Sequence, residues 1–483
     1  MTVATVDRHL FVIFGGTGDL ARRKLIPSLY RLITENDIAD RCIVLGVAPS
    51  DLDDDAYRAW ARDALVASGG EDDLEAWCDD NVYFQRIGRD AGSYDRLRRR
   101  IEEIESDRGL PGNRAFYLAL PPPVFPDAIK ELGDAGLAAG PGWTRLVIEK
   151  PIGTDLASAR ELNAVVHRHF DETQVYRIDH YLGKETVQNL LAFRFSNPMF
   201  ESVWNRDRVE SVEITVAEDL GIGTRAAYCE SSGALRDMVQ NHLTQVLALV
   251  AMEPPLSFDA EQIRNEKVKV IEAIAPIRRE NVVFGQYDSG IIDGAAVPGY
   301  RDEKGVAPDS LTPTFVGIEL EIDTWRWQGV PFYLRTGKRL PKRLTQIAVT
   351  FQRPPLCIFH GHRDSCVVDS DVLLITLQPD EGFTLHFNVK APGQAMMLDS
   401  QALRFSHSEA YGRLPDAYQT LILDVIDGDQ TLFVRADEVD ASWRLYDPLL
   451  DYRPEPHRYT AGSWGPAAMD QGVALGGDAW MGR

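Results

Sequence analysis

The sequence predicts an α/β domain with a parallel sheet, followed by a larger α+β domain with a broad, largely antiparallel sheet. In the first third of the chain, short apolar runs alternate with amphipathic helical stretches, a rhythm typical of parallel strands joined by crossover helices. Beyond about residue 178, runs of alternating polar and apolar residues follow one another, which is typical of antiparallel strands with one buried face. We therefore expect two domains, residues 1–178 and 179–483.

The first domain contains five apolar runs that we expect to be its strands. Helical patterns lie between them at 20–35 and 93–105, and in the second of these Leu97, Ile101 and Ile104 recur at spacings of four and three, as on one face of a helix. The expected strands are 11–14, 43–48, 82–84, 115–120 and 145–150.

In the second domain, alternating runs are interrupted by long helical patterns at 231–252 and 415–427. After about residue 453 the sequence is rich in Pro and Gly with little periodicity, so we expect an irregular tail there. The expected strands are 209–219, 314–323, 345–353, 372–379 and 383–390.

Composition excludes several classes of protein. With 51 Lys and Arg against 73 Asp and Glu, the net charge of −22 disfavours nucleic acid and anionic membranes as partners. No run approaches the about 18 apolar residues of a membrane helix, and residues 1–14 are too weakly apolar for a signal peptide. The five cysteines are odd in number and dispersed, as expected for free thiols in a reducing compartment. We expect a cytoplasmic protein.

A glycine-rich turn directly follows the first expected strand. Residues 16–21 fit the pattern G-x-G-x-x-G/A, in which small residues let the backbone approach a pyrophosphate at the N-terminus of the next helix. A tight turn without a ligand is the alternative. The strand, turn and helix in this order favour a dinucleotide site. Its candidate residues are Gly15, Gly16, Thr17, Gly18, Asp19 and Leu20.

Five segments, one of which includes the glycine-rich turn, together resemble a known protein family. The run RIDHYLGKE at 177–185 packs an acid, an imidazole, a phenol and an ammonium into six positions. With it stand GGTGDLARRKLIPSLY (15–30), EKPIGTDLASARELN (149–163), ALRDMVQNHLTQVLALVAMEPP (234–255) and PFYLRTGKRLPKR (331–343). In this order, from about residue 11 to about 466, the chain resembles the glucose-6-phosphate dehydrogenase family.

The resemblance implies a Rossmann domain followed by an α+β domain that dimerises through its sheet, in a homodimer or homotetramer. It implies oxidation of β-D-glucose 6-phosphate at C1 to 6-phosphoglucono-1,5-lactone, with hydride transfer to NADP or NAD. This is the first step of the oxidative pentose phosphate pathway.

Oxidation of a sugar hemiacetal needs a base for the O1 proton, and imidazole is suited because its pKa lies near neutrality. His242 is in helical register with Leu235, Val239 and Val246, so we expect it on the apolar face of its helix. From that position alone, a histidine packed in the core is the competing interpretation. The resemblance implies that His242 is the catalytic base and that Asp179 orients it. Without the resemblance, a helix cap or a turn residue is the competing interpretation of Asp179.

The resemblance also implies which residues hold the sugar phosphate. Protonated imidazole, phenol and ammonium donate well to a phosphate dianion, which suits His180, Tyr181 and Lys184, although a lone lysine is more commonly solvated surface. Lys150 follows an expected strand at the nucleotide crevice, and by resemblance it contacts both cofactor and substrate. The other matches to the sugar-binding set are Glu218, Asp237, Lys338, Arg343 and Gln378.

The choice of cofactor stays open. NADP-dependent relatives commonly carry an arginine just after the second strand, whereas no arginine stands between Gly46 and Asp51 here. Asp51 and Asp53 can accept a ribose hydroxyl bond as in NAD sites, or can cap the next helix. Arg22 or Arg23 can reach a 2′-phosphate from the first helix. We expect turnover with NAD at least comparable with that of NADP.

One cluster suggests a metal. Cys357, His360, His362 and Cys366 are all zinc-ligand types, but their spacing is not that of a standard zinc module, so we expect no metal. Three alternatives to the assigned activity remain: a dehydrogenase of another sugar on the same fold, a non-catalytic regulatory relative, and a nucleotide-binding sensor.

Overall fold

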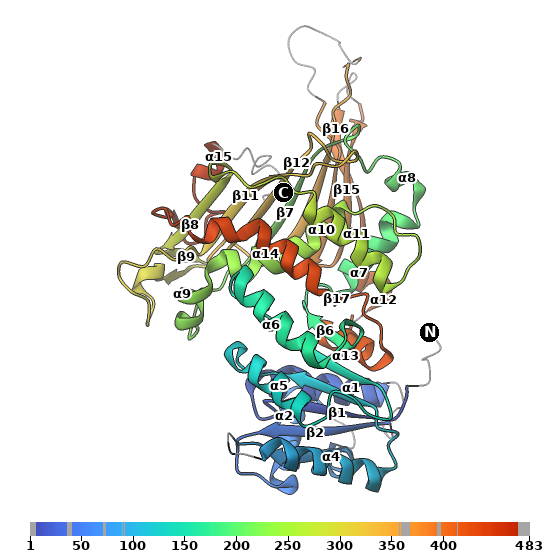
Figure 1. The fold of residues 1–483 in the computed structure, drawn as a ribbon. Helices are drawn as coiled ribbons and strands as arrows, with labels where there is room; N and C mark the ends of the chain where they lie inside the picture. Colours follow the sequence, from blue (N-terminus) through green and yellow to red (C-terminus); the bar gives the residue numbers. More distant parts are fainter. Residues whose placement is uncertain are drawn as a thin grey trace. The chain divides into compact units, whose positions relative to one another are not determined.

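The computed structural model describes residues 6–35, 41–70, 74–88, 90, 92–356, 358, 368–393, 398–412 and 414–471 (Figure 1). The chain divides into two compact units. The first comprises residues 1–184, 256–264 and 415–440, and the second comprises 185–255, 265–414 and 441–483. The first unit therefore includes two segments from far along the chain, which the single expected boundary after residue 178 did not anticipate.

The first unit contains a seven-stranded sheet of order β17-β6-β5-β4-β1-β2-β3. All neighbouring strands pair in parallel except β17, which pairs antiparallel with β6. The expected parallel sheet and the Rossmann class are thus confirmed. The strands are β1 His9–Phe14, β2 Cys42–Ala48, β3 Val82–Arg86, β4 Arg114–Leu118, β5 Thr144–Ile148, β6 Val175–Ile178 and β17 Phe433–Val434.

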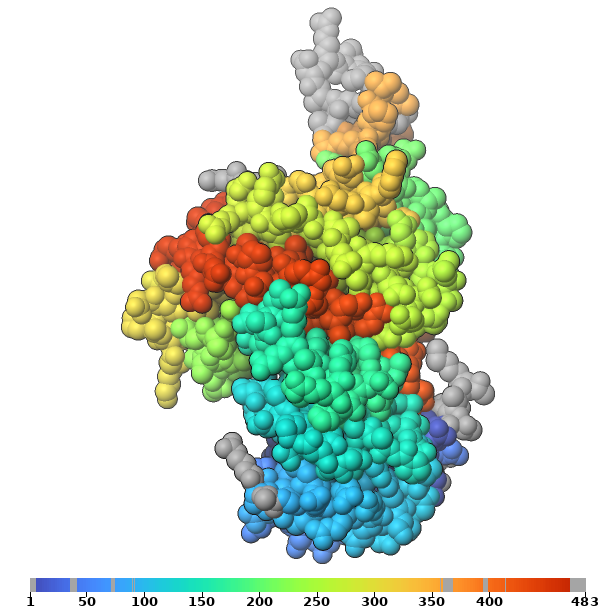
Figure 2. All heavy atoms as spheres, viewed as in Figure 1, coloured from blue at the N-terminus to red at the C-terminus, as the bar shows by residue number. Residues whose placement is uncertain are grey.

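Helices α4 (Ser93–Arg108), α5 (Phe125–Asp134) and α6 (Leu156–His169) pack their apolar side chains on one face of this sheet. Atoms coloured light blue to green, the range that includes these helices, form much of the visible surface of this unit in Figure 2. Leu97, Ile101 and Ile104 are buried there, as their spacing predicts. The other helices are η1 Ala21–Leu25, α1 Ile26–Glu35, α2 Asp54–Ala67, α3 Leu74–Asn81, η2 Pro122–Val124, η3 Glu172–Gln174 and α13 Ala417–Asp427.

The second unit contains a nine-stranded sheet of order β16-β15-β14-β13-β7-β12-β11-β8-β18. Two of its neighbouring pairs, β7 with β12 and β8 with β18, are parallel and the others are antiparallel, so the broad, largely antiparallel sheet is confirmed. The strands are β7 Val209–Ala217, β8 Val282–Asp288, β11 Phe315–Glu321, β12 Pro331–Gly337, β13 Leu344–Phe351, β14 Val372–Gln378, β15 Gly382–Lys390, β16 Leu398–Ser406 and β18 His457–Thr460. A separate hairpin joins β9 Gly290–Ile292 to β10 Ala295–Val297.

The long helical pattern at 231–252 is not one regular helix. It comprises the end of α9 (Ala226–Ala234), a π-helix η4 (Leu235–Leu243) and α10 (Thr244–Ala251). The other helices are α7 Glu185–Phe195, α8 Pro198–Glu201, α11 Ala260–Glu272, η5 Arg279–Asn281, η6 Tyr300–Asp302, α12 His407–Tyr411, α14 Ala436–Leu450 and α15 Ala468–Gln471.

The expected irregular tail is partly wrong, because β18 adds an edge strand to the large sheet and Tyr459 of this strand is buried. Residues Cys357, His360, His362 and Cys366 lie outside the described part of the chain. Within the described part, we find no helix with the length and apolarity needed to cross a bilayer.

Candidate active site

The glycine-rich turn after β1 requires glycine at two positions. Gly15 has a φ of +80°, and a Cβ there would lie 2.2 Å from the Ala119 carbonyl oxygen. A Cβ on Gly16 would lie 2.8 Å from Gly46 Cα, so the turn is pressed against the end of β2. The Tyr57 hydroxyl donates to the Gly16 carbonyl oxygen at 2.9 Å and holds the turn from α2. Glycine at both positions is thus required by the close packing of the turn against the ends of its neighbouring strands, as in the glycine-rich turns of dinucleotide-binding folds.

The remaining turn residues lie at the entrance of the first helix. The Gly18 amide donates to the Gly15 carbonyl oxygen at 2.8 Å, and the Thr17 and Ser50 hydroxyls are 3.1 Å apart. Asp19 forms an exposed ion pair with Arg23 at 3.5 Å. Leu20 ends the turn and precedes η1, so the predicted strand, turn and helix occur in the predicted order.

The groups around the end of β2 bear on the choice of cofactor. Asp53 is the N-cap of α2, since its Oδ1 accepts from the Ala56 amide at 2.9 Å. Asp51 instead pairs at 2.9 Å with Arg86, which ends the neighbouring strand β3. Arg86 was not expected from the sequence, because it lies at the end of the third strand and not of the second. The signal was available in the sequence, because the third expected strand, which lies beside β2 in the sheet, is followed by this arginine.

Lys150 lies just past the carboxyl end of β5, where its peptide bond to Pro151 is cis. The preceding residue, Glu149, is buried, and the Tyr117 hydroxyl donates to its Oε1 at 2.6 Å. Burial raises the pKa of Glu149. Neither Glu149 nor Tyr117 is among the site residues expected from the sequence.

Asp179, His180, Tyr181 and Lys184 gather just past β6, at the same carboxyl edge of the sheet as the glycine-rich turn. Asp179 is 3% exposed, and its Oδ1 accepts from the Tyr181 amide at 3.0 Å, so it does close a turn as its position alone suggests. The Lys184 ammonium lies 4.3 Å from the centre of the buried Tyr181 ring. The His180 ring stacks on Tyr418 of α13, with ring centres 6.4 Å apart and planes 9° from parallel.

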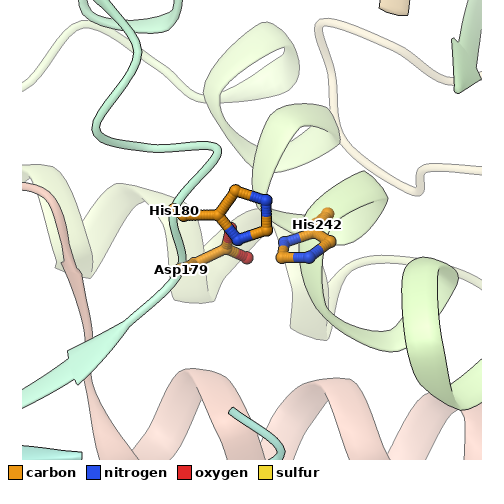
Figure 3. A group of neighbouring side chains, drawn as sticks. All are labelled: Asp179, His180 and His242. Carbon is orange, nitrogen blue, oxygen red and sulfur yellow. The ribbon is translucent and has the colours of Figure 1, made fainter. Parts of the chain in front are cut away.

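His242 lies on η4 of the second unit and is 1% exposed (Figure 3). The figure also shows Asp179 and His180 on the segment that follows β6 of the first unit. The expected spacing of His242 with Leu235, Val239 and Val246 assumed 3.6 residues per turn, whereas η4 is a π-helix. All four side chains are nevertheless buried, so the expected position of His242 on the apolar side of its helix is confirmed. π-Helical turns within helices occur frequently at functional sites.

Glu218, Asp237 and Lys338 line one pocket of the second unit, together with Cys229 and Tyr300. The Lys338 ammonium pairs with the Glu218 carboxylate. These two residues follow β7 and β12, whose parallel pairing brings both carboxyl ends to one edge.

Asp237 is held in this pocket by a tyrosine that the sequence did not single out. Asp237 accepts from the Tyr228 hydroxyl at 2.9 Å. Burial, followed by the Asp237 charge, raises the pKa of Tyr228, so the phenol remains a donor at neutral pH. Two carboxylates and an ammonium are thus gathered here, and groups of these types can bond to the hydroxyls of a sugar.

Arg343 and Gln378 are bonded to each other, with Arg343 Nη2 3.2 Å from Gln378 Oε1. Gln378 also donates to Thr345 Oγ1 at 2.8 Å. Neither residue is among those that line the pocket of Glu218, Asp237 and Lys338. Three of the five further sugar-binding candidates therefore line this pocket. Arg343 and Gln378 do not line it but lie at the same end of the sheet, since Leu344 pairs with Ala217 and Thr345 pairs with Gln378.

Comparisons with known proteins cover nearly the whole chain. Residues 12–189 match the family model "Glucose-6-phosphate dehydrogenase, NAD binding domain", and residues 191–481 match "Glucose-6-phosphate dehydrogenase, C-terminal domain". The glucose-6-phosphate 1-dehydrogenase of Aggregatibacter actinomycetemcomitans is 43% identical over 481 residues, which is 97% of this chain and 96% of that protein. That of Bacillus subtilis (strain 168) is 42% identical over 482 residues, 98% of each.

The fold agrees with the sequence comparison. A solved structure of a glucose-6-phosphate dehydrogenase in complex with its substrate glucose-6-phosphate is 36% identical, with a TM-score of 0.90 over 98% of both chains. The glucose-6-phosphate 1-dehydrogenase of Mycobacterium avium is 35% identical, with a TM-score of 0.81 over 96% of this chain and 97% of that one.

Proposed function

Because this chain belongs to the glucose-6-phosphate dehydrogenase family, we propose that it oxidises β-D-glucose 6-phosphate at C1 to 6-phosphoglucono-1,5-lactone. The observation that carries the proposal is the cluster of His180, Tyr181 and Lys184 at the carboxyl edge of the sheet, where the glycine-rich turn also lies. Proposed phosphate-binding residues and a glycine-rich turn for the nucleotide, both at the carboxyl edge of one sheet, suit a dehydrogenase of a phosphorylated substrate.

In this proposal, NAD or NADP supplies the hydride acceptor, and the residues of the chain supply the base and the binding groups. His242 takes the O1 proton as C1 loses its hydride, and Asp179 orients the imidazole by accepting a hydrogen bond from its other nitrogen. Burial of both side chains supports these roles, because a dry environment strengthens the pairing of imidazolium with carboxylate.

The binding groups divide by charge. His180, Tyr181 and Lys184 donate to the phosphate, while Glu218 and Asp237 accept from sugar hydroxyls. Lys338, Arg343 and Gln378 complete the proposed sugar set, and Lys150 lies beside both cofactor and substrate. The turn residues from Gly15 to Leu20 hold the pyrophosphate.

Substrate choice is tested by comparing glucose 6-phosphate with glucose. We expect purified protein to reduce the nicotinamide cofactor with glucose 6-phosphate, and to use glucose at least about a hundredfold less well in kcat/KM, because three donors to the phosphate are lost. Equal use of the two sugars would favour a dehydrogenase of an unphosphorylated sugar.

For the cofactor, we propose that NAD is used at least comparably with NADP. Asp51 repels a 2′-phosphate, and Asp53 is engaged as a helix cap, so neither acid favours NADP. Arg86 is the cation best placed beside β2 to offset this repulsion, since it ends the adjacent strand and pairs with Asp51.

We propose a cytoplasmic homodimer or homotetramer. The edge strand β16 leaves Leu403 and Phe405 exposed, which suits further packing against the large sheet. The buried free thiols of Cys42, Cys78 and Cys229 suit a reducing compartment. Light scattering of the purified protein tests the assembly, with a mass two or four times that of one chain expected.

A further inference from the structure

The first unit buries a carboxyl group to which the proposed mechanism gives no task. Glu149 is 9% exposed and follows β5 directly. Tyr117 of β4 donates to its Oε1 at 2.6 Å, and the phenol of Tyr418 on α13 is hydrogen bonded to it as well. A strand of the sheet and a helix from far along the chain therefore meet at one acid.

Tyr418 connects this acid to the proposed phosphate site. Its ring stacks on His180, and the Lys24 ammonium lies 6.0 Å from the ring centre. Lys24 also pairs at 2.7 Å with Asp416, the residue that caps α13 by accepting from the Tyr418 amide at 3.0 Å. The orientation of the ring against which His180 packs is thus fixed at two points, at Glu149 and at the cap of α13.

The charges around the acid agree with this arrangement. Burial raises the pKa of Glu149, while the two phenols and the neighbouring Lys150 charge act in the opposite direction. Burial, followed by the Glu149 charge, raises the pKa of both Tyr117 and Tyr418. Both phenols therefore stay protonated and able to donate at neutral pH.

We propose that Glu149 and Tyr418 are positioning residues for substrate phosphate, acting through the bond between them and the stack of Tyr418 on His180. The proposal rests on the proposed function, in which His180 and Lys150 contact substrate. The hydrogen bond to Glu149 holds the Tyr418 phenol in place, and the Tyr418 ring in turn limits the orientation of the His180 imidazole. The hydrogen bonds to Glu149 also anchor the backbone next to Lys150.

The key test is Tyr418→Phe, which keeps the ring and its stacking surface and removes the hydroxyl alone. We expect KM for glucose 6-phosphate to rise about fivefold while kcat changes less than about twofold, because a loosened binding group weakens ground-state contacts. A purely structural role would lower Tm and leave KM unchanged. Tyr287→Phe is the matched control, since it removes a similar buried phenol bond, to Glu303 at 3.1 Å, in the second unit.

Two substitutions of the acid complete the test. Glu149→Gln keeps the shape and one acceptor, so we expect KM within about threefold of the parent, whereas Glu149→Leu removes both bonds and should raise KM about tenfold. If Glu149→Leu fails to fold, Tyr418→Phe decides the matter. Unchanged KM for glucose 6-phosphate in folded Tyr418→Phe overturns the proposal, as does an equal rise in Tyr287→Phe.

The activity of the parent enzyme distinguishes a failure of the proposed function from a failure of the positioning role. Parent protein that does not oxidise glucose 6-phosphate refutes the proposed function. An active parent whose Tyr418→Phe variant is kinetically unaltered refutes the positioning role alone. A KM effect on glucose 6-phosphate that leaves kcat/KM for glucose unchanged supports it most directly.

Discussion

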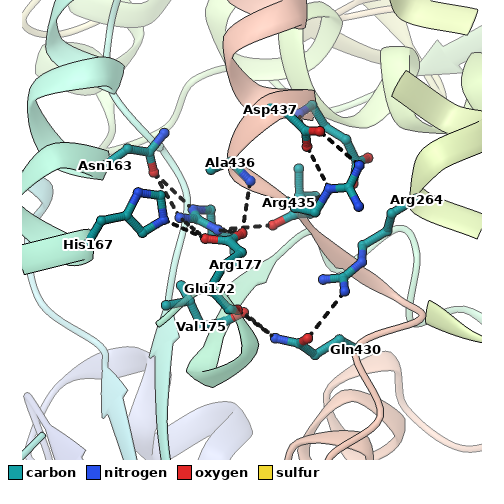
Figure 4. Close-up of polar contacts among 12 residues, drawn as sticks. Asn163, His167, Glu172, Val175, Arg177, Arg264, Gln430, Arg435, Ala436 and Asp437 are labelled. Atoms are coloured by element: carbon teal, nitrogen blue, oxygen red, sulfur yellow. Dashed lines mark hydrogen bonds and ion pairs between the residues drawn. The ribbon is translucent and has the colours of Figure 1, made fainter. Parts of the chain in front are cut away.

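Replacing Glu172 with Gln should destabilise the first unit strongly, because its carboxylate joins two segments of that unit that lie far apart in the chain (Figure 4). Oε1 accepts from Arg177 Nη1 at 2.6 Å and from the Ala436 amide at 3.0 Å. Oε2 accepts from Arg177 Nη2 at 3.1 Å and bonds to His167 Nε2 at 2.7 Å. All four contacts need an acceptor or a negative charge at Glu172.

The size of the effect follows from the burial of Arg177, whose side chain is 1% exposed. Without the carboxylate, Arg177 keeps its bonds to Asn163 Oδ1, at 2.9 and 3.2 Å, but loses its charge partner. Removing one member of a buried ion pair costs about 3–5 kcal/mol. Because the Glu172 side chain is 27% exposed and water can reach it, we expect a loss near the lower end, about 3 kcal/mol.

Equilibrium urea denaturation of the parent and Glu172→Gln measures this loss as a change in the free energy of unfolding. Glu75→Gln is the matched control. Glu75 is 84% exposed and pairs with Arg62 at 3.5 Å, so its loss should cost less than about 1 kcal/mol. A loss below about 1 kcal/mol for Glu172→Gln, equal to that of the control, would refute the reasoning.

The same network predicts a dependence on pH. Burial alone would raise the pKa of Glu172, but the Arg177 charge and the bonds from Arg177, His167 and the Ala436 amide outweigh it, so the pKa is lowered. A depressed carboxyl pKa contributes stability that is present above the unfolded value, about 4.3, and is lost as the pH falls through the folded value. The difference between parent and Glu172→Gln should therefore shrink on acidification below about pH 4.

Three kinetic predictions follow from the proposed site. His242→Asn should lower kcat by about 10²–10⁴-fold with KM for glucose 6-phosphate little changed, and near-normal turnover would remove His242 as the base. Lys184→Ala should raise KM for glucose 6-phosphate about ten- to a hundredfold. If this variant distinguished glucose 6-phosphate from glucose as well as the parent does, Lys184 would not bind the phosphate. The parent should use NAD at least comparably with NADP in kcat/KM, and a preference for NADP above about a hundredfold would contradict this. Arg86→Ala should reduce kcat/KM with NADP about tenfold and leave that with NAD unaltered, whereas equal losses with both cofactors would exclude recognition of the 2′-phosphate by Arg86.

The sequence predicts most elements of the fold because their signals are local. The five apolar runs of the first domain all form parallel strands, since a buried strand needs only a short apolar segment. The second domain's alternating runs likewise form strands of one sheet. By contrast, α13 and β17 belong to the first unit although they lie beyond residue 415, and no local pattern records such a long-range partnership.

The candidate site likewise contains residues that the local sequence predicts and residues that it does not. The turn at Gly15 and Gly16 is predictable because backbone sterics restrict those positions to glycine. The phenols of Tyr117 and Tyr418 could not be predicted, because they reach Glu149 from a neighbouring strand and a distant helix. The π-helix that carries His242 could not be predicted either, because the spacing of its apolar residues also fits an ordinary α-helix.

Transfer of the C1 hydrogen from labelled substrate tests the central claim most directly. Glucose 6-phosphate deuterated at C1 is incubated with the purified protein and NAD or NADP, and the reduced cofactor is analysed by mass spectrometry. Direct hydride transfer predicts reduced nicotinamide that carries the deuterium, formed in equal amount with 6-phosphoglucono-1,5-lactone. Reduced nicotinamide without deuterium, or no reduction in the presence of glucose 6-phosphate, would contradict the account.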